Sequence, residues 1–186
     1  MDLEKILNKA APVASRQILG WQLYAREPEG TLVGGMITET EAYNEEDAAS
    51  HSFNGKTLRN QVMFGPAGYI YTYFTYGMHW CLNIVTGPKD NGEAVLIRAI
   101  QPNRGLDIMR QRRSKRSDND LTNGPAKLCQ ALNITGEDNG GQLNSKTGKF
   151  LLLPPETDQV LRIVATTRLG IKRDTHRLWR FLATNN

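Results

Sequence analysis

Hydrophobic and polar residues alternate along several short stretches of this chain, as they do in strands that bury one face. These stretches are positions 21–26, 31–43, 69–75, 78–85 and 94–100, with shorter ones at 150–153 and 162–165. Helical spacing is limited to positions 3–7, 12–19, 106–113 and 123–132. Turn sequences such as Glu27–Gly30 and Lys89–Gly92 separate neighbouring strands, and Gly34–Gly35 predicts a bulge or a close backbone approach. The pattern predicts a mixed fold in which strands predominate.

The strand expected at positions 69–75 has an unusual composition. One face is wholly aromatic (Tyr69, Tyr71, Tyr73) and the other resembles core (Ile70, Thr72, Phe74). Tyr76–Gly77 then interrupts the pattern, and because glycine tolerates positive φ, a bend here would turn Tyr76 outward. Tyrosine is common in strands, so strand propensity alone is one explanation of this composition. The other explanation is a platform on which nucleobases stack with a wedge beside it, because four tyrosines in eight residues followed by a bend are also typical of that arrangement.

Two carboxylates fall together near the end of the strand expected over 31–43. Because side chains alternate along a strand, Ile37, Glu39, Glu41 and Tyr43 would share one face. One explanation is a polar edge strand that discourages aggregation. A second explanation comes from Arg98, the one charged residue in the apolar strand expected at 94–100. A buried arginine needs an acidic partner, and the two carboxylates would provide it. We therefore expect Arg98 to pair with Glu39 and Glu41, as a structural salt bridge or as part of a chemical site.

Length and charge fit one compact domain with a polyanionic partner. The chain has 186 residues, 39% of them hydrophobic, which is enough for a single core. Lys and Arg number 23 against 19 Asp and Glu, so the net charge is +4. The signs are segregated, with acids at positions 39–47 and bases at 98–116 and 162–180. Such runs are most often solvated surface, so they permit nucleic-acid binding without establishing it.

The cysteines and the N-terminus indicate a reducing compartment. Cys81 and Cys129 lie in apolar patterns without paired spacing, which is typical of a reduced cytosolic protein. The N-terminus lacks the apolar segment of an export signal, and no apolar run approaches the roughly 18 residues of a membrane span. We expect a cytoplasmic protein, in the bacterial cytosol or nucleoid, or a nuclear one if the source is eukaryotic.

Several blocks of sequence together carry a family resemblance. The blocks are Glu39–Tyr43, Arg59–Asn60 with Met63–Phe64, Tyr71–Tyr73 leading into Tyr76–Asn83, Leu96–Ala99 and Gly124–Leu132. They resemble the alkyladenine (3-methyladenine) DNA glycosylase family, in the family's order, over roughly positions 12–172. The resemblance implies an α+β fold, a single mixed domain over residues 1–186. It would be built around a curved antiparallel β-sheet with flanking helices and a protruding β-hairpin that enters the DNA minor groove.

The same resemblance implies roles for single residues. Glu41 is similar to the family's general base, and Arg98 to the residue that helps to hold the attacking water. The base pocket would be formed by Tyr43, His51, Tyr73 and Asn83, with Asn83 as its discriminating floor. Tyr76 resembles the residue that intercalates into DNA, with Met78 beside it. Arg59, Lys127 and the basic run at 98–116 are candidate phosphate contacts.

These assignments imply a monofunctional DNA glycosylase of base excision repair. It would flip an alkylated or deaminated purine out of duplex DNA and hydrolyse the N-glycosidic bond with a Glu41-activated water, leaving an abasic site. Lys56 is the only lysine between Thr38 and Asn83 and lies in a polar loop, so Schiff-base chemistry is not expected. We expect a monomer that binds double-stranded DNA containing a damaged purine, with no cofactor, no metal and no membrane contact.

Two other functions remain open from the sequence. A non-catalytic nucleic-acid-binding module could use the aromatic strand Tyr69–Tyr76 as a platform and would be indifferent to Glu41. A metal-dependent hydrolase could use Glu41, His51 and neighbouring acids. The second is disfavoured because the three histidines, His51, His79 and His176, are not at paired ligand spacing.

Overall fold

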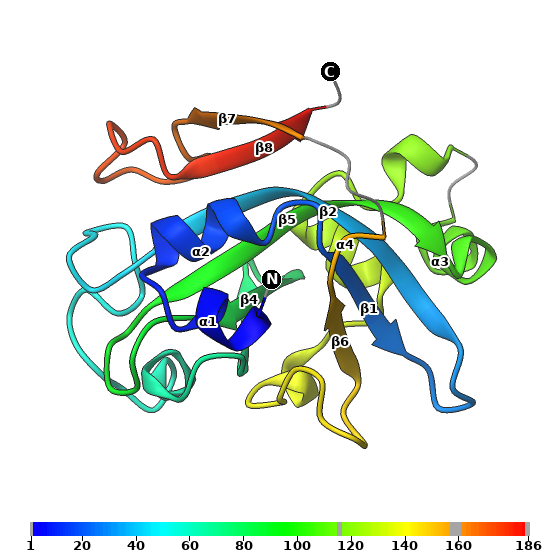
Figure 1. The fold of residues 1–186 in the computed structure, drawn as a ribbon, viewed down its shortest axis with the longest axis horizontal. Helices are drawn as coiled ribbons and strands as arrows, with labels where there is room; N and C mark the ends of the chain where they lie inside the picture. Colours follow the sequence, from blue (N-terminus) through cyan, green and yellow to red (C-terminus); the bar gives the residue numbers. More distant parts are fainter. Residues whose placement is uncertain (1, 115–116, 157–160, 185–186) are drawn as a thin grey trace.

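The computed structural model describes residues 2–114, 117–156 and 161–184, which form an antiparallel sheet with short helices packed on it (Figure 1). The strands are β1 (Gln22–Arg26), β2 (Leu32–Tyr43), β3 (Ile70–Thr75), β4 (His79–Val85), β5 (Ala94–Arg104), β6 (Phe150–Leu153), β7 (Arg162–Thr166) and β8 (Arg180–Thr184). The helices are α1 (Leu3–Leu7), α2 (Ala11–Gln17), α3 (Leu106–Arg113) and α4 (Pro125–Ala131), with 3-10 turns at Gln61–Phe64, Asp118–Asp120 and Gly136–Asp138. In these ranges no helix has the length and apolar character needed to cross a membrane. The α+β class is confirmed, and β5 continues past the predicted Ile100 to Arg104.

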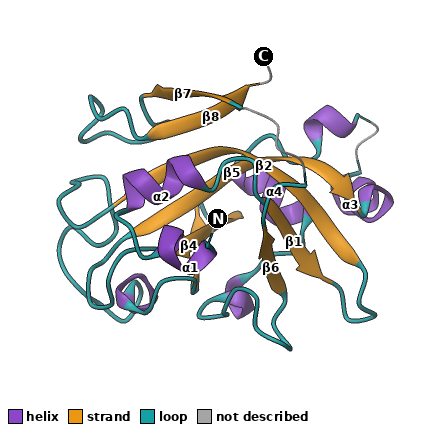
Figure 2. Ribbon diagram, in the orientation of Figure 1, coloured by secondary structure: helices purple, strands orange, loops and turns teal. Residues whose placement is uncertain are grey.

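The long strand β2 organises the sheet. One edge of β2 pairs with β5, whereas the other pairs first with β1 and then with β8. The strand order is β3-β4-β5-β2-β1-β6, and the β7–β8 hairpin joins it through β8. Register shifts near Gly34 and Glu39 interrupt the β2–β5 ladder, and such irregularities bend strands. The sheet accordingly curls into an open half-barrel (Figure 2).

Two glycines in β2 allow its neighbours to approach closely. A Cβ atom on Gly34 would lie 2.0 Å from the carbonyl oxygen of Leu23 in β1. A Cβ atom on Gly35 would lie 2.0 Å from the carbonyl oxygen of Gln101 in β5. Both distances are far inside van der Waals contact, so any side chain would force a neighbouring strand away. The close approach predicted for Gly34–Gly35 is confirmed.

Helices cover both faces of the central strands. In Figure 1, α2 lies in front of β2 and β5, and α4 lies behind them. Thr40 Oγ1 donates to the carbonyl oxygen of Ser15 in α2 at 3.0 Å, so Thr40 faces α2. Its neighbours Glu39 and Glu41 therefore face the other side, toward α4. Core side chains such as Ile18, Leu82, Ile97 and Leu128 are buried, and each contributes roughly 1.5–3 kcal/mol.

The β3–β4 hairpin projects Tyr76 into solvent. Met78 N–H donates to Thr75 O at 3.2 Å and closes a turn in which Tyr76 and Gly77 have φ values of 51° and 67°. Positive φ at both central residues suits the tight turn of a hairpin. Glycine adopts this conformation freely, whereas Tyr76 does so at a steric cost. Tyr76 is 79% exposed, so the predicted bend and outward tyrosine are confirmed.

One expectation for β3 is wrong. Phe74 was placed on the core face, but it is 46% exposed and packs against the Trp80 ring, with 4.9 Å between ring centroids. Alternation along the strand holds, yet β3 leaves the sheet toward the hairpin tip. The face that is core at Ile70 is therefore open at Phe74.

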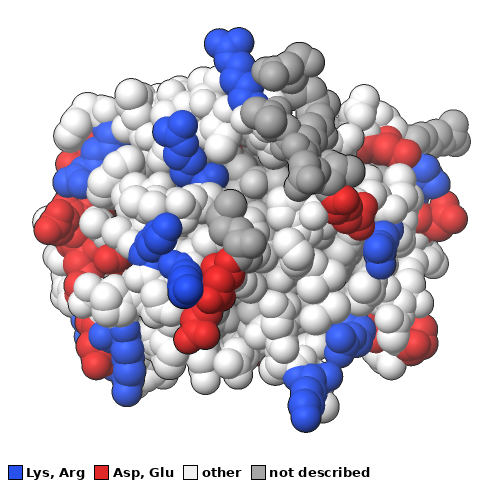
Figure 3. Space-filling model, viewed as in Figure 1, with Lys and Arg blue, Asp and Glu red and all other residues white. Residues whose placement is uncertain are grey.

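Charges that are segregated along the sequence are mixed in space. Figure 3 shows Lys and Arg interspersed with Asp and Glu on the face that carries α1 and α2. Several arginines of the basic run have acidic partners within the chain: Arg98 with Glu39 and Glu41, Arg104 with Glu156, Arg110 with Asp107 and Asp118, and Arg112 with Glu27. Lys115 and Arg116 lie outside the described residues. Internal pairing weakens the case for this run as a phosphate-binding surface.

Candidate active site

A pocket with a volume of about 390 Å³ lies on the α4 side of the sheet. It is lined by side chains from β2, β3, β4 and β5, by the first turn of α4, and by two loops, one around His51 and one that follows β7. The structure brings most of the predicted site residues to this lining: Glu41, Tyr43, His51, Tyr73, Tyr76, Asn83 and Arg98. Met78, Arg59 and Lys127 are not part of it.

Glu41 is the buried acid of the pocket. Its side chain has no solvent-accessible surface. Oε1 accepts a hydrogen bond from Leu169 N–H at 2.8 Å and lies 3.2 Å from Arg98 Nη1, and Oε2 accepts from the Tyr43 hydroxyl at 2.8 Å. A carboxylate has about four acceptor positions. Two hydrogen bonds and one ion pair, from different parts of the chain, thus fix its orientation, and Oε2 makes only one of these three contacts.

Arg98 connects Glu41 to a second carboxylate. Its Nε atom donates to Glu39 Oε1 at 2.7 Å, while Nη1 approaches Glu41. Glu39 Oε1 also accepts from Arg180 Nε of β8 at 2.6 Å. The predicted pairing of Arg98 with both acids is confirmed. Two carboxylates and two guanidinium groups balance each other in a cluster that is largely shielded from water.

Aromatic rings form one wall of the pocket. The His51 ring lies edge-on to Tyr73 with 4.5 Å between centroids, and Tyr71 and Tyr73 are 5.8 Å apart. His51 Nδ1 and the Tyr71 hydroxyl are 2.8 Å apart. Burial raises the pKa of Tyr71 to about 12, and burial together with the nearby Arg59 guanidinium lowers the pKa of His51. Both groups are therefore neutral at pH 7.

Tyr43 forms another part of the wall, beside the acid. Burial raises its pKa well above the ordinary value, and the neighbouring Glu41 carboxylate adds to the effect. The Tyr43 hydroxyl therefore keeps its proton and serves as a donor to Glu41. Its ring also contacts the guanidinium of Arg168, whose Cζ lies 4.6 Å from the ring centroid. Tyr43 thus joins the pocket to a charged group behind it.

Asn83 lies at the inner end of the pocket. It is 4% exposed, and its Nδ2 atom donates to the backbone carbonyl of Tyr71 at 3.1 Å. An amide nitrogen carries two protons, so this bond sets the orientation of the side chain and leaves one donor for a ligand. The adjacent Cys81 thiol also lines the pocket, and burial raises its pKa.

The rim, meaning the surface beside the pocket, is exposed and partly apolar; it includes Tyr76 and Leu169 of the lining and also Met78 of the same hairpin, which is not in the lining. Tyr76 is 79% exposed, Met78 67% and Leu169 47%. Arg59 is exposed and makes no ion pair within the described parts of the chain. Lys127 differs, because its Nζ lies 2.5 Å from Asp120 Oδ1 and 2.8 Å from Asn123 Oδ1. Of the two predicted phosphate contacts, Arg59 alone presents an uncompensated charge here.

Sequence reasoning did not assign roles to Tyr71, to Leu169, or to the Arg168–Asp47 pair behind the pocket. Tyr71 lies on the predicted aromatic face, so the alternation could have identified it. Leu169, which donates to Glu41, and the buried Arg168–Asp47 pair could not be found this way. Nothing in the local pattern of Arg168–Ile171 shows that the loop after β7 returns to β2.

The arrangement is suited to acid–base chemistry beside a planar ring. It offers a carboxylate with one acceptor position to spare, a guanidinium next to it, and aromatic faces within the same small pocket. Across residues 2–114, 117–156 and 161–184, no group of three or more His, Cys, Asp and Glu side chains is placed to hold a metal ion.

Comparison with known proteins gives a consistent result. Residues 5–186 match the model of a family described as "Methylpurine-DNA glycosylase (MPG)". A protein of Carboxydothermus hydrogenoformans named "Putative 3-methyladenine DNA glycosylase" is 46% identical over 176 residues, covering 94% of this chain and 90% of the relative. A protein of the same name from Francisella tularensis subsp. tularensis is 43% identical over 186 residues, covering 100% and 96%. Another, from Nitrosospira multiformis, is 51% identical over 149 residues, covering 80% and 75%.

Proposed function

Since the chain belongs to the methylpurine-DNA glycosylase family, we propose that it is a monofunctional 3-methyladenine DNA glycosylase. It would hydrolyse the N-glycosidic bond of a damaged purine in double-stranded DNA and leave an abasic site. The observation that carries the proposal is the position of Glu41, a carboxylate held by two hydrogen bonds and an ion pair in a pocket walled by aromatic rings. We also propose that the enzyme acts as a monomer.

The size and place of the pocket favour a base that has left the helix. A volume of about 390 Å³ is at the small end of the range for ligand sites, so it suits one base and excludes a duplex. The sugar carbon of a stacked nucleotide is out of reach, and extrusion costs a few kcal/mol. Tyr76, exposed at the hairpin tip and also part of the pocket lining, would fill the vacated space and recover part of that cost by stacking.

Stacking would hold the extruded base. Tyr43, His51 and Tyr73 present ring faces in the pocket, and a stacked base gains about 1–3 kcal/mol per aromatic contact. A methylated purine with a positive charge would gain further from cation–π attraction. Asn83 would add discrimination, because its remaining amide proton can donate to a ring nitrogen or to O6 and its bulk opposes the exocyclic amino group of guanine.

Glu41 would serve as the base for the attacking water. Leu169 and Arg98 occupy Oε1, so we assign Oε2, which accepts only from Tyr43, as the atom that takes the proton. The hydroxide equivalent attacks the sugar carbon, the glycosidic bond breaks, and its electron pair leaves with the purine. The negative carboxylate also stabilises the oxocarbenium-like sugar of the transition state. No lysine lines the pocket in the described part of the chain, which favours water as the nucleophile.

The test is release of free base from duplexes that contain 3-methyladenine, 7-methylguanine or hypoxanthine, measured in EDTA. We expect release from at least one lesion duplex, none from the matched undamaged duplex, and an intact sugar–phosphate backbone after the reaction. Binding without release from any duplex would support the non-catalytic binding module. Release that disappears in EDTA would support the metal-dependent hydrolase.

A further inference from the structure

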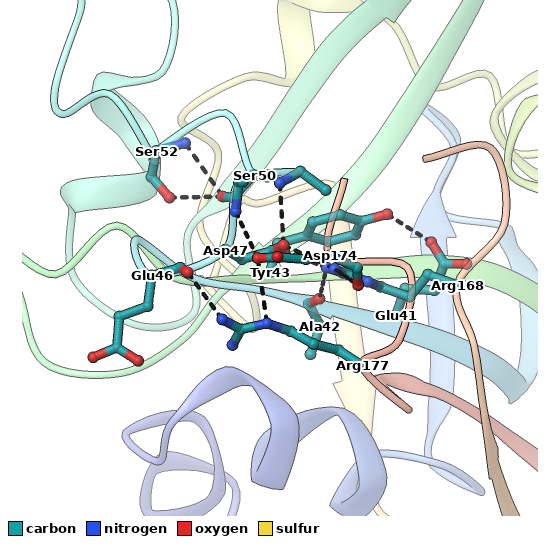
Figure 4. A network of polar contacts seen from close by, with 12 residues as sticks. Glu41, Ala42, Tyr43, Glu46, Asp47, Ser50, Ser52, Arg168, Asp174 and Arg177 are labelled. Atoms are coloured by element: carbon teal, nitrogen blue, oxygen red, sulfur yellow. Dashed lines mark hydrogen bonds and ion pairs between the residues drawn. The ribbon is translucent and has the colours of Figure 1, made fainter. Parts of the chain in front are cut away.

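An ion pair with no solvent exposure lies directly behind the pocket. Arg168, in the loop after β7, and Asp47, in the loop after β2, both have fully inaccessible side chains. Arg168 Nη2 donates to Asp47 Oδ1 at 2.8 Å, and Nη1 donates to Asp47 Oδ2 and to the backbone oxygen of Ala42 at 2.9 Å. Figure 4 shows this network reaching from Asp47 through Arg168 toward Glu41. Neither charged group lines the pocket.

The position of Arg168 affects both hydrogen-bond donors to Glu41, Leu169 and Tyr43. Its peptide continues into Leu169, whose N–H donates to Glu41 Oε1 at 2.8 Å. Its guanidinium lies over the ring of Tyr43, whose hydroxyl donates to Glu41 Oε2 at 2.8 Å. The guanidinium also approaches Trp179, with 5.5 Å from Cζ to the ring centroid. A displacement of Arg168 would therefore move both donors at once.

Further contacts hold the same two loops together. Asp174 Oδ2 accepts from Ala48 N–H at 2.9 Å, and Arg177 Nη2 donates to the carbonyl of Glu46 at 3.0 Å. The first contact is partly buried and the second is exposed, whereas the Arg168–Asp47 pair is fully buried. Figure 4 draws all four side chains. The two contacts secure the loops, but no hydrogen bond or ion pair of the Asp174 or Arg177 side chain to Glu41, Leu169 or Tyr43 is found among the described residues. Arg168 provides the link from these loops to the acid.

We propose that Arg168, fixed by Asp47, is a positioning residue for Glu41. The pair holds the Leu169 amide and the Tyr43 hydroxyl in place, so the carboxylate points Oε2 into the pocket before DNA arrives. Removing two charges from water is costly, and a buried pair does not generally stabilise a fold more than apolar residues of the same volume. The function that we assign to the Arg168–Asp47 pair is to hold Glu41 in its reactive orientation before the substrate binds. The inference rests on the proposed function, because it concerns the rate of the same reaction.

The test separates rate from affinity in Asp47→Asn and Arg168→Lys. Excision is followed in single turnover at saturating enzyme, and affinity is measured with a duplex that contains a stable abasic-site analogue. We expect the rate to fall about 10- to 100-fold, as it does when groups that orient a catalytic side chain are lost, with affinity changed less than about threefold. Glu27→Gln, which breaks the remote and mostly buried pair with Arg112, is the matched control and keeps the wild-type rate.

Breaking a buried pair can also unfold a protein, so a charge-free double variant, Asp47→Asn with Arg168→Gln, accompanies the single ones. If the double variant melts like the wild type and still excises slowly, the positioning role is supported. If any folded variant of the pair excises at the wild-type rate, the inference is overturned. A wild-type protein that releases no base overturns the proposed function instead, so the two failures are distinguishable.

Discussion

The centre of the pocket and its rim are built in opposite ways. The centre comprises Glu41 in the pocket lining and, directly behind the lining, the Asp47–Arg168 pair; these three side chains have no exposed surface, and their charges are paired within the chain. At the rim, Tyr76 is 79% exposed and Met78 67%. Leu169 belongs to both regions, because its amide holds Glu41 while its side chain is half exposed. The centre is complete before any DNA arrives, whereas the rim has surface that only a partner can bury.

The two regions should therefore affect different measured quantities, the rate of base release for the centre and the affinity for DNA for the rim. Preorganised donors and charges act on the transition state, so changes at the centre should lower the rate of base release and spare binding. Exposed apolar and charged groups gain their partners on association, so changes at the rim should lower affinity. Each substitution below can therefore contradict the division as well as support it.

The largest effect is expected from Glu41→Gln. The amide keeps the volume and accepts hydrogen bonds at one atom only, so it cannot take a proton from water. Single-turnover excision should fall by a factor of about 10² to 10⁴, and binding to lesion DNA should persist. Glu45→Gln removes an exposed acid from the same run and should leave the rate unchanged. Equal losses of rate and affinity in Glu41→Gln would place Glu41 in binding instead.

A smaller loss is expected from Arg98→Lys. An ammonium keeps the charge but lacks the planar fork that reaches Glu39 and Glu41 together, at 2.7 Å and 3.2 Å. We expect single-turnover excision to fall about 10- to 100-fold with affinity nearly constant. Arg104→Lys is the matched control on the same strand, since Arg104 and its partner Glu156 are both about half exposed. The division would fail if the two variants behaved alike.

At the rim, Tyr76→Ala should weaken binding more than chemistry. Loss of the ring removes the group that would occupy the space left by the flipped base, worth about 1–3 kcal/mol, so affinity for lesion duplexes should fall about 5- to 100-fold. Tyr76→Phe keeps the ring and should restore most of the affinity. Fluorescence anisotropy with a labelled lesion duplex measures both. An unchanged Kd for Tyr76→Ala would show that the hairpin does not enter DNA.

These two regions also differ in how far the sequence predicts them. Tyr76–Gly77 breaks an alternating pattern, and Arg98 is an isolated charge in an apolar strand, so both anomalies are visible in the chain itself. The pairing of Arg98 with Glu39 and Glu41 followed because a buried charge needs a partner and few acids were near. The family resemblance predicted site roles for seven residues that the structure places in the lining of a single pocket: Glu41, Tyr43, His51, Tyr73, Tyr76, Asn83 and Arg98.

What the sequence did not predict depends on contacts between distant loops. Asp47 and Arg168 meet across 121 positions, and Leu169 reaches Glu41 across 128. In the sequence, Asp47 ends an acidic run and Arg168 belongs to a basic one, and such runs are usually solvated. The sequence around Asp47 or Arg168 does not distinguish these buried residues from the exposed charged residues of the same runs. Lys127 remains a predicted phosphate contact, but the sequence did not show its internal partner Asp120, which a turn just before its helix contributes.

A still smaller effect separates the two predicted phosphate contacts. Arg59→Ala should lower affinity a few-fold for damaged and undamaged duplexes alike, and reduce the slope of log K against log salt by about 1. Lys127→Ala should change both quantities less, because Asp120 and Asn123 already engage its ammonium group. Titrations at several salt concentrations measure the slopes. Similar slopes for the two variants would mean that Lys127 exchanges its internal partner for DNA.

The smallest effect concerns His51, which stands between centre and rim. Burial of the ring and the nearby Arg59 lower its pKa below the ordinary 6.5, so the unfolded chain binds this proton at higher pH than the folded one. The stability contributed by the neutral ring is present above pH 6.5 and is lost as the pH falls from there through the folded pKa. Because His51 remains partly exposed, the Tm difference should be less than about 3 °C.

Thermal unfolding between pH 7.5 and 5.5 measures this effect of His51. The wild type should lose slightly more stability on acidification than His51→Gln, which has no proton to bind. His176→Gln, which removes an exposed histidine, should follow the wild type. If His51→Gln also follows it, the ring titrates equally in the folded and unfolded states. His51 would then belong to the solvated rim, and the pocket wall would depend on the tyrosines alone.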